Sequence, residues 1–294
     1  MVPRFSAVPK ITNPSAREFH SDYVAQGNPV LIACGERWKA HATWSPEYFA
    51  RIAPNLSVPV KEYRAAGIHQ SKWTFAAYAD FLRSVEGETH SRHTVLPYCH
   101  DIPIFTWLPE LLPDVSPFPV EYLPAYYRSE WWRYVQFFMG PAHSLTPLHF
   151  DTLLTHNLFF QIYGSKRFTI YAPSDARYCR RRGWRWFDFD PEHPDYERIP
   201  ESRRAIPHEV IVGPGDVLYL PPGTLHHVRG LGTSISFNID FHTRASALKS
   251  LLGPLRGMPR ESLYYNALIT LGVAFGAPEP WVFRRYKPYL SYVV

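Results

Sequence analysis

Residues 131–241 contain a series of short β-branched and aromatic runs separated by turn residues, and this pattern constrains the fold more than any other feature of the sequence. Glycine and proline bound most of the runs, as is typical of strands joined by tight turns. Many short strands in series form a sandwich or a barrel. The runs are RYVQFFM, NLFFQIYG, KRFTIYAP, HEVIVGPGDVLYLPPG, HHVRGL and TSISFNID.

The segments on either side of this core favour helices. Residues 1–130 combine amphipathic stretches (SAREFHSDYVAQG, SPEYFARIA, KWTFAAYADFLRSV) with a short buried strand, PVLIAC, which predicts an α/β region packing on the barrel. Residues 246–294 return to helical patterns, and ESLYYNALITLGVAFG is too apolar to face water, so it should pack on the barrel or on another subunit. We predict one functional domain with a core at 131–245.

Composition indicates a globular protein with an ample core. Of 294 residues, 46% are hydrophobic, while the three cysteines lack the paired spacing of a disulfide framework or a cysteine-based zinc site. No signal segment or run long enough to span a membrane is evident. We therefore expect a cytoplasmic protein with no membrane association.

The most basic stretch is YCRRRGWRWF at 178–187, within an insertion at about 174–207. Arginine interleaved with aromatic residues can bind nucleic acid. Acidic residues follow at once, however, so self-pairing within the insertion is the preferred interpretation and no nucleic-acid partner is expected.

His149 and Asp151 are the first candidates for metal ligands. Chance placement of 14 histidines and 26 acidic residues gives roughly one His-x-acid triplet, so the motif alone is weak evidence. Two further triplets begin at His20 and His193, but they fall in a predicted helix and in a loop, where no distal strand histidine can join them. Alternate residues of an extended segment face the same side, so His149 and Asp151 can reach one ion.

A third ligand is available in GDVLYLPPGTLHHVRG, where a strand, a tight turn and a second strand place His226 and His227 at a strand start. Neighbouring strand residues face opposite sides, so only one of the two can bind. Two imidazoles and one carboxylate form an open triad suited to non-haem Fe(II) oxygenases, whereas structural zinc needs a fourth ligand. Taken singly, each of these residues is more often an ordinary core or surface residue, and the joint placement carries the prediction.

Lys166 heads the strand after the predicted metal strand. On its own it would be interpreted as a solvated strand-end lysine. Inside a barrel, its ammonium could instead pair with the far carboxylate of a dicarboxylate cosubstrate that chelates the iron. Thr146 and Tyr134 could add hydroxyl hydrogen bonds to that carboxylate.

These residues resemble the JmjC or cupin-like Fe(II)- and 2-oxoglutarate-dependent oxygenases, and within them the asparaginyl hydroxylase subgroup that acts on hypoxia-inducible factor. The resemblance rests on five ordered motifs over about residues 130–241: TPLHFD, NLFFQIYGSKRF, FDFDPEHPDYERIP, VGPGDVLYLPPGTLHHV and SISFNID. It implies a double-stranded β-helix (a jelly-roll or cupin fold) that uses Fe(II), 2-oxoglutarate and O2. Oxidative decarboxylation would yield succinate and CO2 while a C–H bond is hydroxylated.

The resemblance also implies a role for each residue. His149, Asp151 and His226 would hold the iron and be catalytic, with His226 preferred over His227 because the family's ligand follows the turn directly. Lys166, with Thr146 and Tyr134, would bind 2-oxoglutarate. Two asparagines would help to position the cosubstrate and one glutamine would face the substrate: Asn157, Asn238 and Gln136.

The sequence departs from the subgroup at two places. The segment between Asp151 and Asn157 is about two residues longer, and the bulky aromatic residues usual before the distal histidine are replaced by Gly223-Thr224-Leu225. Both changes leave the metal ligands intact and affect the substrate. The expected substrate is a peptide, protein or amino-acid side chain. The resemblance also implies a homodimer through the C-terminal helices, because the resembled subgroup uses such helices in this way.

Other functions are weighed against this one. The first alternative is a tailoring hydroxylase of a small-molecule or peptide natural product. An N-methyl-lysine demethylase shares the iron chemistry but normally carries reader modules or cysteine-rich zinc domains. A non-catalytic cupin-like binding protein would usually have lost a triad residue, and a cupin isomerase would have no reason for Lys166.

Overall fold

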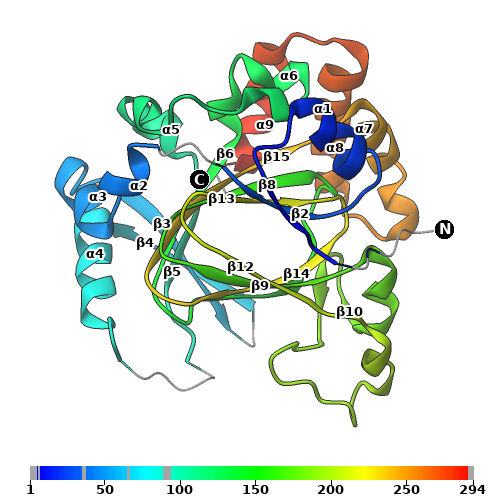
Figure 1. Cartoon of the computed structure of the whole chain (residues 1–294), viewed down its shortest axis with the longest axis horizontal. Coiled ribbons are helices and arrows are strands. Elements are labelled where there is room, and N and C mark those ends of the chain that lie inside the picture. Colours follow the sequence, from blue (N-terminus) through cyan, green and yellow to red (C-terminus); the bar gives the residue numbers. More distant parts are fainter. Residues whose placement is uncertain (1–4, 6, 35–37, 65–66, 89–93, 291–294) are drawn as a thin grey trace.

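The computed structural model describes residues 5, 7–34, 38–64, 67–88 and 94–290. The described strands form two sheets that face each other, with the α-helices on the outer side of one of them (Figure 1). The larger sheet has nine strands in the order β1-β2-β13-β8-β15-β6-β5-β3-β4, and the smaller has six in the order β10-β11-β7-β14-β9-β12. This is the cupin, or jelly-roll, architecture that was predicted.

The strand bounds show how the two sheets divide the sequence. The larger sheet consists of β1 (Lys10–Thr12), β2 (Val30–Ala33), β3 (Ser57–Arg64), β4 (Gly67–Thr74), β5 (Tyr98–Ile102), β6 (Val135–Gly140), β8 (His156–Tyr163), β13 (Asp216–Leu220) and β15 (Ser234–Phe241). The smaller sheet consists of β7 (Leu145–His149), β9 (Lys166–Tyr171), β10 (Arg181–Arg182), β11 (Trp186–Phe187), β12 (His208–Val212) and β14 (Leu225–Gly230). Every predicted core run therefore contains at least one strand.

The larger sheet is covered on both faces, and β15 shows how its sequence satisfies this. All of its residues are buried, but polar and apolar residues alternate. Successive strand residues point to opposite faces, so one set meets the helices and the other meets the smaller sheet. The helix-facing set is Ile235, Phe237, Ile239 and Phe241. The inward-facing polar set is Ser236, Asn238 and Asp240.

Two apolar cores follow from this arrangement. The larger core lies between the outer face of the nine-stranded sheet and the helices, where Phe160 and Phe237 stack with ring centroids 5.0 Å apart. The smaller core lies between the sheets and joins Phe159 of β8 to Phe168 of β9, with ring centroids 5.0 Å apart. The polar inner residues of β15 lie beyond this apolar layer, where the space between the sheets remains open as a cavity.

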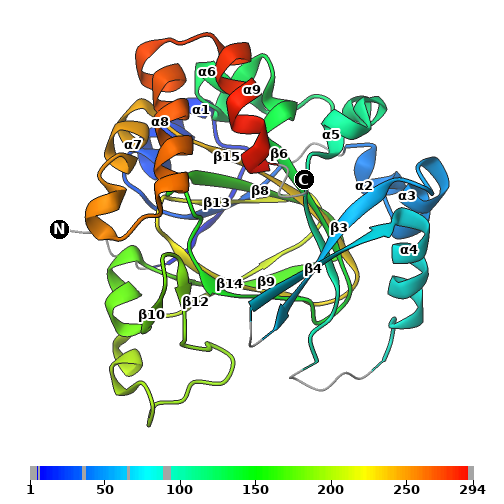
Figure 2. The same ribbon diagram turned by 180° about the vertical axis from the view of Figure 1, so that it is seen from behind.

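The α-helices lie before and after the core strands in the sequence (Figures 1 and 2), whereas two 3-10 segments lie in the insertion. Ser45 and Thr74 cap two of them, accepting hydrogen bonds from the backbone N–H groups of Tyr48 and Ala77. The α-helices are α1 (Ala16–Glu18), α2 (Ala40–Thr43), α3 (Pro46–Ile52), α4 (Phe75–Ser84), α5 (Ile104–Trp107), α6 (Ala125–Arg128), α7 (Arg244–Ser250), α8 (Arg260–Phe275) and α9 (Glu279–Leu290). A π-helical segment is η1 (Phe19–Val24), and the 3-10 segments are η2 (Pro109–Val115), η3 (Val120–Tyr122), η4 (Trp131–Tyr134), η5 (Pro173–Tyr178), η6 (Pro200–Arg204) and η7 (Gly253–Arg256).

The N-terminal region is less separate than its sequence suggests. Its strands β1 to β5 extend both edges of the core sheet, β2 pairing with β13 and β5 pairing with β6. The β3–β4 hairpin, which the sequence did not predict, ends this sheet (Figure 2). Residues 72–74 belong to β4 rather than to the predicted helix, because their alternating pattern pairs with β3.

The insertion folds back onto the smaller sheet. Its hairpin β10–β11 pairs with β7, Trp186 lying opposite His149 in register. A third apolar cluster, which includes Phe150, Phe187 and Leu225, fixes it to the outside of that sheet. Arg180 and Arg182 both approach Asp188 at 3.6 Å, which fits the self-paired interpretation of this part of the basic stretch. In the described part of the chain, no helix combines the length and apolar character needed to cross a membrane.

Candidate metal centre

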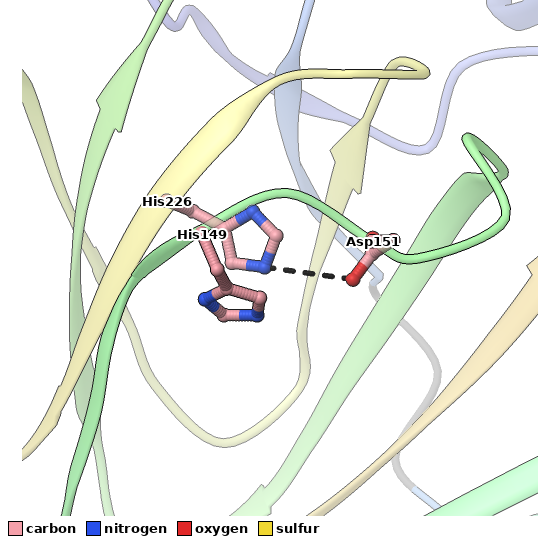
Figure 3. Close-up of side chains that lie close together, drawn as sticks. All are labelled: His149, Asp151 and His226. Atoms are coloured by element: carbon pink, nitrogen blue, oxygen red, sulfur yellow. Dashed lines mark ion pairs between the residues drawn. The ribbon is translucent and has the colours of Figure 1, made fainter. Parts of the chain in front are cut away.

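The structure brings His149, Asp151 and His226 together at one end of the smaller sheet (Figure 3). β7 ends at His149, and Asp151 begins the turn that follows. The second residue of β14 is His226, which pairs with His149 in register. One potential ligand atom from each residue lies within 4.8 Å of the other two, and His226 Nε2 is 3.7 Å from Asp151 Oδ1. That spacing allows all three to bind one ion.

Local hydrogen bonds turn both imidazoles toward the centre. His149 Nδ1 lies 2.8 Å from the Pro147 carbonyl oxygen, and His226 Nδ1 lies 3.1 Å from that of Thr224. A carbonyl oxygen can only accept, so each Nδ1 must donate and each Nε2 keeps a free lone pair. Asn157 Nδ2 donates to Asp151 Oδ2 at 3.4 Å, which leaves Oδ1 toward His226.

The protonation of His149 also fits a ligand. Burial lowers its pKa well below the ordinary value, and the nearby His226 adds to the effect. A metal needs the neutral imidazole, which this environment favours. Within the described ranges, no fourth His, Cys, Asp or Glu joins the group. The donor set therefore matches an open two-histidine, one-carboxylate Fe(II) site better than a closed zinc site.

His227 faces the opposite side of β14, as strand alternation requires. Its Nε2 lies 3.7 Å from Glu192 Oε2 in the insertion. Arg167 and Arg229 also form ion pairs with Glu192. These contacts hold the pKa of the Glu192 carboxyl far below its usual range, with His227 contributing most and Arg229 next. The preferred residue of the histidine pair, His226, is thus the one in the metal group, and His227 helps to hold the insertion.

A cavity of about 100 Å³ opens beside the three ligands, between the two sheets. Most of the residues predicted for the cosubstrate and substrate line it. These are Gln136 on β6, Thr146 on β7, Asn157 on β8, Lys166 on β9 and Asn238 on β15. The strands on which they lie come from both sheets, so the fold assembles the cavity from residues that are far apart in the sequence.

Lys166 is the most unusual group in the cavity wall. Its side chain is 1% exposed, and its Nζ donates to Tyr98 Oη and Ser236 Oγ, both at 2.8 Å. The ammonium also lies 5.1–5.4 Å from the ring centroids of Tyr98, Phe138 and Phe159. No carboxylate pairs with it among the described residues, and burial lowers its pKa to about 7. A buried cation with only neutral neighbours is ready to receive an anion.

Tyr134 does not belong to this site, which corrects the prediction made for it. It closes the 3-10 segment η4, so the alternation of β6 begins only at the next residue. Its hydroxyl donates to Glu279 Oε1 at 3.1 Å, and its ring packs against Phe283 and Tyr286 of α9. The tyrosine beside Lys166 is Tyr98, from β5.

This difference gives a direct comparison of two tyrosines. We expect Tyr98→Phe to raise the 2-oxoglutarate concentration needed for half-saturation by roughly 5- to 10-fold, because one neutral hydrogen bond contributes about 1 kcal/mol. Tyr134→Phe should leave that concentration unchanged and lower thermal stability only. Cosubstrate titrations of both variants test this, and an equal effect from the two would contradict the assignment.

Several cavity residues were not predicted from the sequence. On one side, Tyr63 Oη lies 3.0 Å from His100 Nε2, and His100 Nδ1 lies 2.9 Å from Asp101 Oδ2. Asp101 also binds Lys61 at 2.5 Å, and although burial opposes ionisation, His100 and Lys61 keep its pKa well below the usual range. Asp240 and Arg185 complete the charged lining. Asp240 could have been predicted from the sequence, because it lies two positions after Asn238 and so faces the same side of β15. No comparable pattern in the sequence marks Tyr63 in the β3–β4 hairpin, or His100 and Asp101 in β5.

A jelly-roll fold whose inner cavity is lined by an open His-Asp-His group is an arrangement found in the cupin class of proteins. Comparison with known proteins agrees, since the model of the cupin-like domain family matches residues 16–247. The chain belongs to this family, and its relatives are JmjC proteins as the resemblance implied.

Three relatives illustrate the range of this similarity. Lysine-specific demethylase 8 of Xenopus tropicalis is 28% identical, covering 80% of this chain and 52% of the relative. The bifunctional peptidase and (3S)-lysyl hydroxylase JMJD7 of Homo sapiens is 26% identical, covering 79% of this chain and 83% of the relative. The tRNA wybutosine-synthesizing protein 5 of Gallus gallus is 22% identical, covering 79% of this chain and 76% of the relative.

These relatives bear on the finer assignments. This chain spans 52–59% of the length of three of the curated relatives it matches. Their names include demethylases and a lysyl hydroxylase rather than an asparaginyl hydroxylase, so membership of that subgroup stays a prediction.

Proposed function

We propose that this protein is an Fe(II)- and 2-oxoglutarate-dependent dioxygenase that hydroxylates a C–H bond in a peptide, protein or amino-acid side chain. The observation that carries the proposal is the pairing of two features in one cavity, an open His-Asp-His group and the buried, anion-free ammonium of Lys166. An iron-binding cupin that used no dicarboxylate cosubstrate would gain nothing from this buried charge.

Each residue has a distinct task in this proposal. His149, Asp151 and His226 would hold Fe(II), which together with 2-oxoglutarate and O2 supplies the oxidising power for C–H hydroxylation and yields succinate and CO2. Lys166 would pair with the far carboxylate of 2-oxoglutarate, with Tyr98 and Ser236 steering its ammonium. The protein's own contribution is to orient the target carbon and to exclude water.

The remaining cavity residues would complete the binding of both substrates. The amide of Asn157 holds the Asp151 carboxylate, while the side-chain oxygens of Asn157 and Asn238 are buried without a partner. Each Nδ2 donates one hydrogen bond, to Asp151 or to Asp240. The second N–H of each amide and the Thr146 hydroxyl would therefore donate to the cosubstrate, whose oxygens only accept, while the unpartnered amide oxygens would accept from a donor on the primary substrate. Gln136 lies on the same inner face of the larger sheet and would contact the primary substrate.

The proposal is tested by turnover of 2-oxoglutarate with peptide libraries and free amino acids, with succinate as the common readout. Mass spectrometry of the substrate gives the reaction type, since hydroxylation adds one oxygen. Loss of a methyl group as formaldehyde would instead identify the N-methyl-lysine demethylase reaction that the names of several relatives raise. Absence of succinate formation with wild-type protein loaded with iron, even without a prime substrate, would count against the oxygenase.

We also propose a homodimer through the C-terminal helices. Apolar side chains on η7 and α8 are exposed, including Leu255 at 85% and Phe275 at 68%. Burying such side chains in a subunit interface would remove their contact with water. Sedimentation should show a dimer that the Leu255→Glu and Phe275→Glu double variant converts to a folded monomer, and an unchanged sedimentation coefficient would argue against this interface.

A further inference from the structure

Arg185 is the member of the basic stretch 178–187 that lines the metal cavity. The other arginines of the stretch have partners elsewhere. Arg180 and Arg182 approach Asp188, and Arg181 donates to the Trp184 and Arg256 carbonyl oxygens. The proposed function uses none of these residues, so the different placement of Arg185 needs its own explanation.

The backbone holds Arg185 close to the metal ligands. Its carbonyl oxygen accepts a hydrogen bond of 3.2 Å from the N–H of Phe150, which lies between His149 and Asp151. The next residue, Trp186, pairs with His149 in register, with ring centroids 5.1 Å apart. This pairing joins the β10–β11 hairpin to the sheet that carries the metal ligands. The backbone of Arg185 is therefore held at a defined position relative to those ligands.

An aromatic surface carries the guanidinium. The Trp186 ring makes an edge contact with the Tyr63 ring, with centroids 5.7 Å apart. Arg185 Cζ lies 4.4 Å from the centroid of the Trp186 ring. Stacking of this kind keeps the planar guanidinium extended, with its N–H groups free at the edge. The edge groups therefore remain available to a ligand in the cavity.

Arg185 forms no ion pair within 4.0 Å among the residues that the structure describes. The acids of the cavity have other contacts, because Asp101 binds Lys61 and His100, Asp151 belongs to the metal group and Asp240 accepts a hydrogen bond from Asn238. The cosubstrate carboxylate is matched by the buried Lys166. A second cation in the same cavity thus remains unmatched, and a half-buried charge favours a ligand that neutralises it.

We infer that Arg185 recognises a carboxylate on the primary substrate, either an acidic side chain of a peptide or the carboxylate of a free amino acid. This inference rests on the proposed function and deepens it. A guanidinium binds a planar carboxylate through two parallel hydrogen bonds. A dianionic phosphate fits less well, because the acids Asp101, Asp151 and Asp240 line the same cavity.

The test uses calorimetry on the full chain loaded with Mn(II) and saturating 2-oxoglutarate. The probes are free aspartate and glutamate, the capped tripeptides Gly-Asp-Gly and Gly-Glu-Gly, the amide twin of each, and capped Gly-phosphoserine-Gly. At least one carboxylate probe should bind wild type 10-fold or more tightly than its amide twin. Arg185→Gln should abolish that preference, Arg185→Lys should retain part of it, and Arg182→Gln, a matched exposed arginine, should retain all of it.

The results separate this inference from the proposed function. Tighter binding of the free amino acids or of the capped peptides identifies the source of the carboxylate. No preference for carboxylate over amide, a preference for phosphoserine, or a preference that survives Arg185→Gln would overturn the inference. A weaker Fe(II)–2-oxoglutarate absorption band in Arg185→Gln would assign the residue to the cosubstrate instead, whereas absence of that band in wild type would remove the proposed function.

Discussion

The His149→Ala variant should lose the visible charge-transfer band that wild-type protein develops when Fe(II) and then 2-oxoglutarate are added without oxygen. The variant removes one of two imidazoles whose ring nitrogens face the centre. Loss of an outer-shell partner alone costs about 10- to 100-fold in metal affinity, so loss of a ligand should cost more than about 100-fold. Succinate formation should fall to background.

The control for this prediction is His193→Ala. His193 also begins a His-x-Asp triplet, but it is exposed in the insertion and lies outside the metal group. Its replacement should leave the band and turnover at wild-type levels. A folded His149→Ala protein that still binds Fe(II) with wild-type affinity would show that the three residues are not a metal site.

The second large effect is expected for Lys166→Met, which keeps the length of the side chain and removes its charge. Removing one partner of a buried charged pair costs about 3–5 kcal/mol, which corresponds to roughly 100- to 1,000-fold or more in affinity. We therefore expect 2-oxoglutarate binding to weaken on that scale while Fe(II) binding is retained. Calorimetric titration of both ligands measures this, with the exposed Lys72→Met as the control.

The same variant should stabilise the ligand-free protein, which a simple packing role would not predict. Burial lowers the pKa of Lys166 from 10.5 to about 7, so between these values the unfolded chain binds a proton that the folded chain does not. The free energy of unfolding of wild type should therefore rise with pH over this window. Lys166→Met should gain about 1–4 kcal/mol at pH 7, and the gain should disappear toward pH 10.

Affinity for 2-oxoglutarate should follow the charge of Lys166 in wild type. It should decline as the pH rises above about 7, because the free protein must then take up a proton to bind the dianion. If Lys166→Met instead lowers the free energy of unfolding and the 2-oxoglutarate affinity of wild type does not change with pH, Lys166 does not bind the cosubstrate carboxylate.

The sequence predicts the core strands well because both faces of the larger sheet are buried. Such strands are rich in buried apolar residues, and in β15 the polar residues that alternate with them face the cavity. Asn238 itself was predicted from the family resemblance rather than from this alternation. His149, Asp151 and His226 were predictable because strand alternation and one tight turn place them on a common side.

The site predictions failed where contacts between segments distant in the sequence determine which side chains reach the cavity. The prediction for Tyr134 assumed that β6 begins before that residue, but η4 rotates its side chain into the helical core. Tyr98 reaches Lys166 across 68 positions of the sequence through the pairing of β5 with β6. Arg185 could not be separated from its basic neighbours, because only the register of β11 against β7 turns it toward the cavity.

The alternation of β15 has a consequence for how this protein can diverge. Substitutions at positions 236, 238 and 240 alter the cavity chemistry, whereas substitutions at positions 235, 237 and 239 alter the packing with the helices. Reactivity and foldability are thus encoded by interleaved sets of positions on one strand. A mutational library confined to the inner set can therefore search for new substrates while the stability margin of the scaffold is largely preserved.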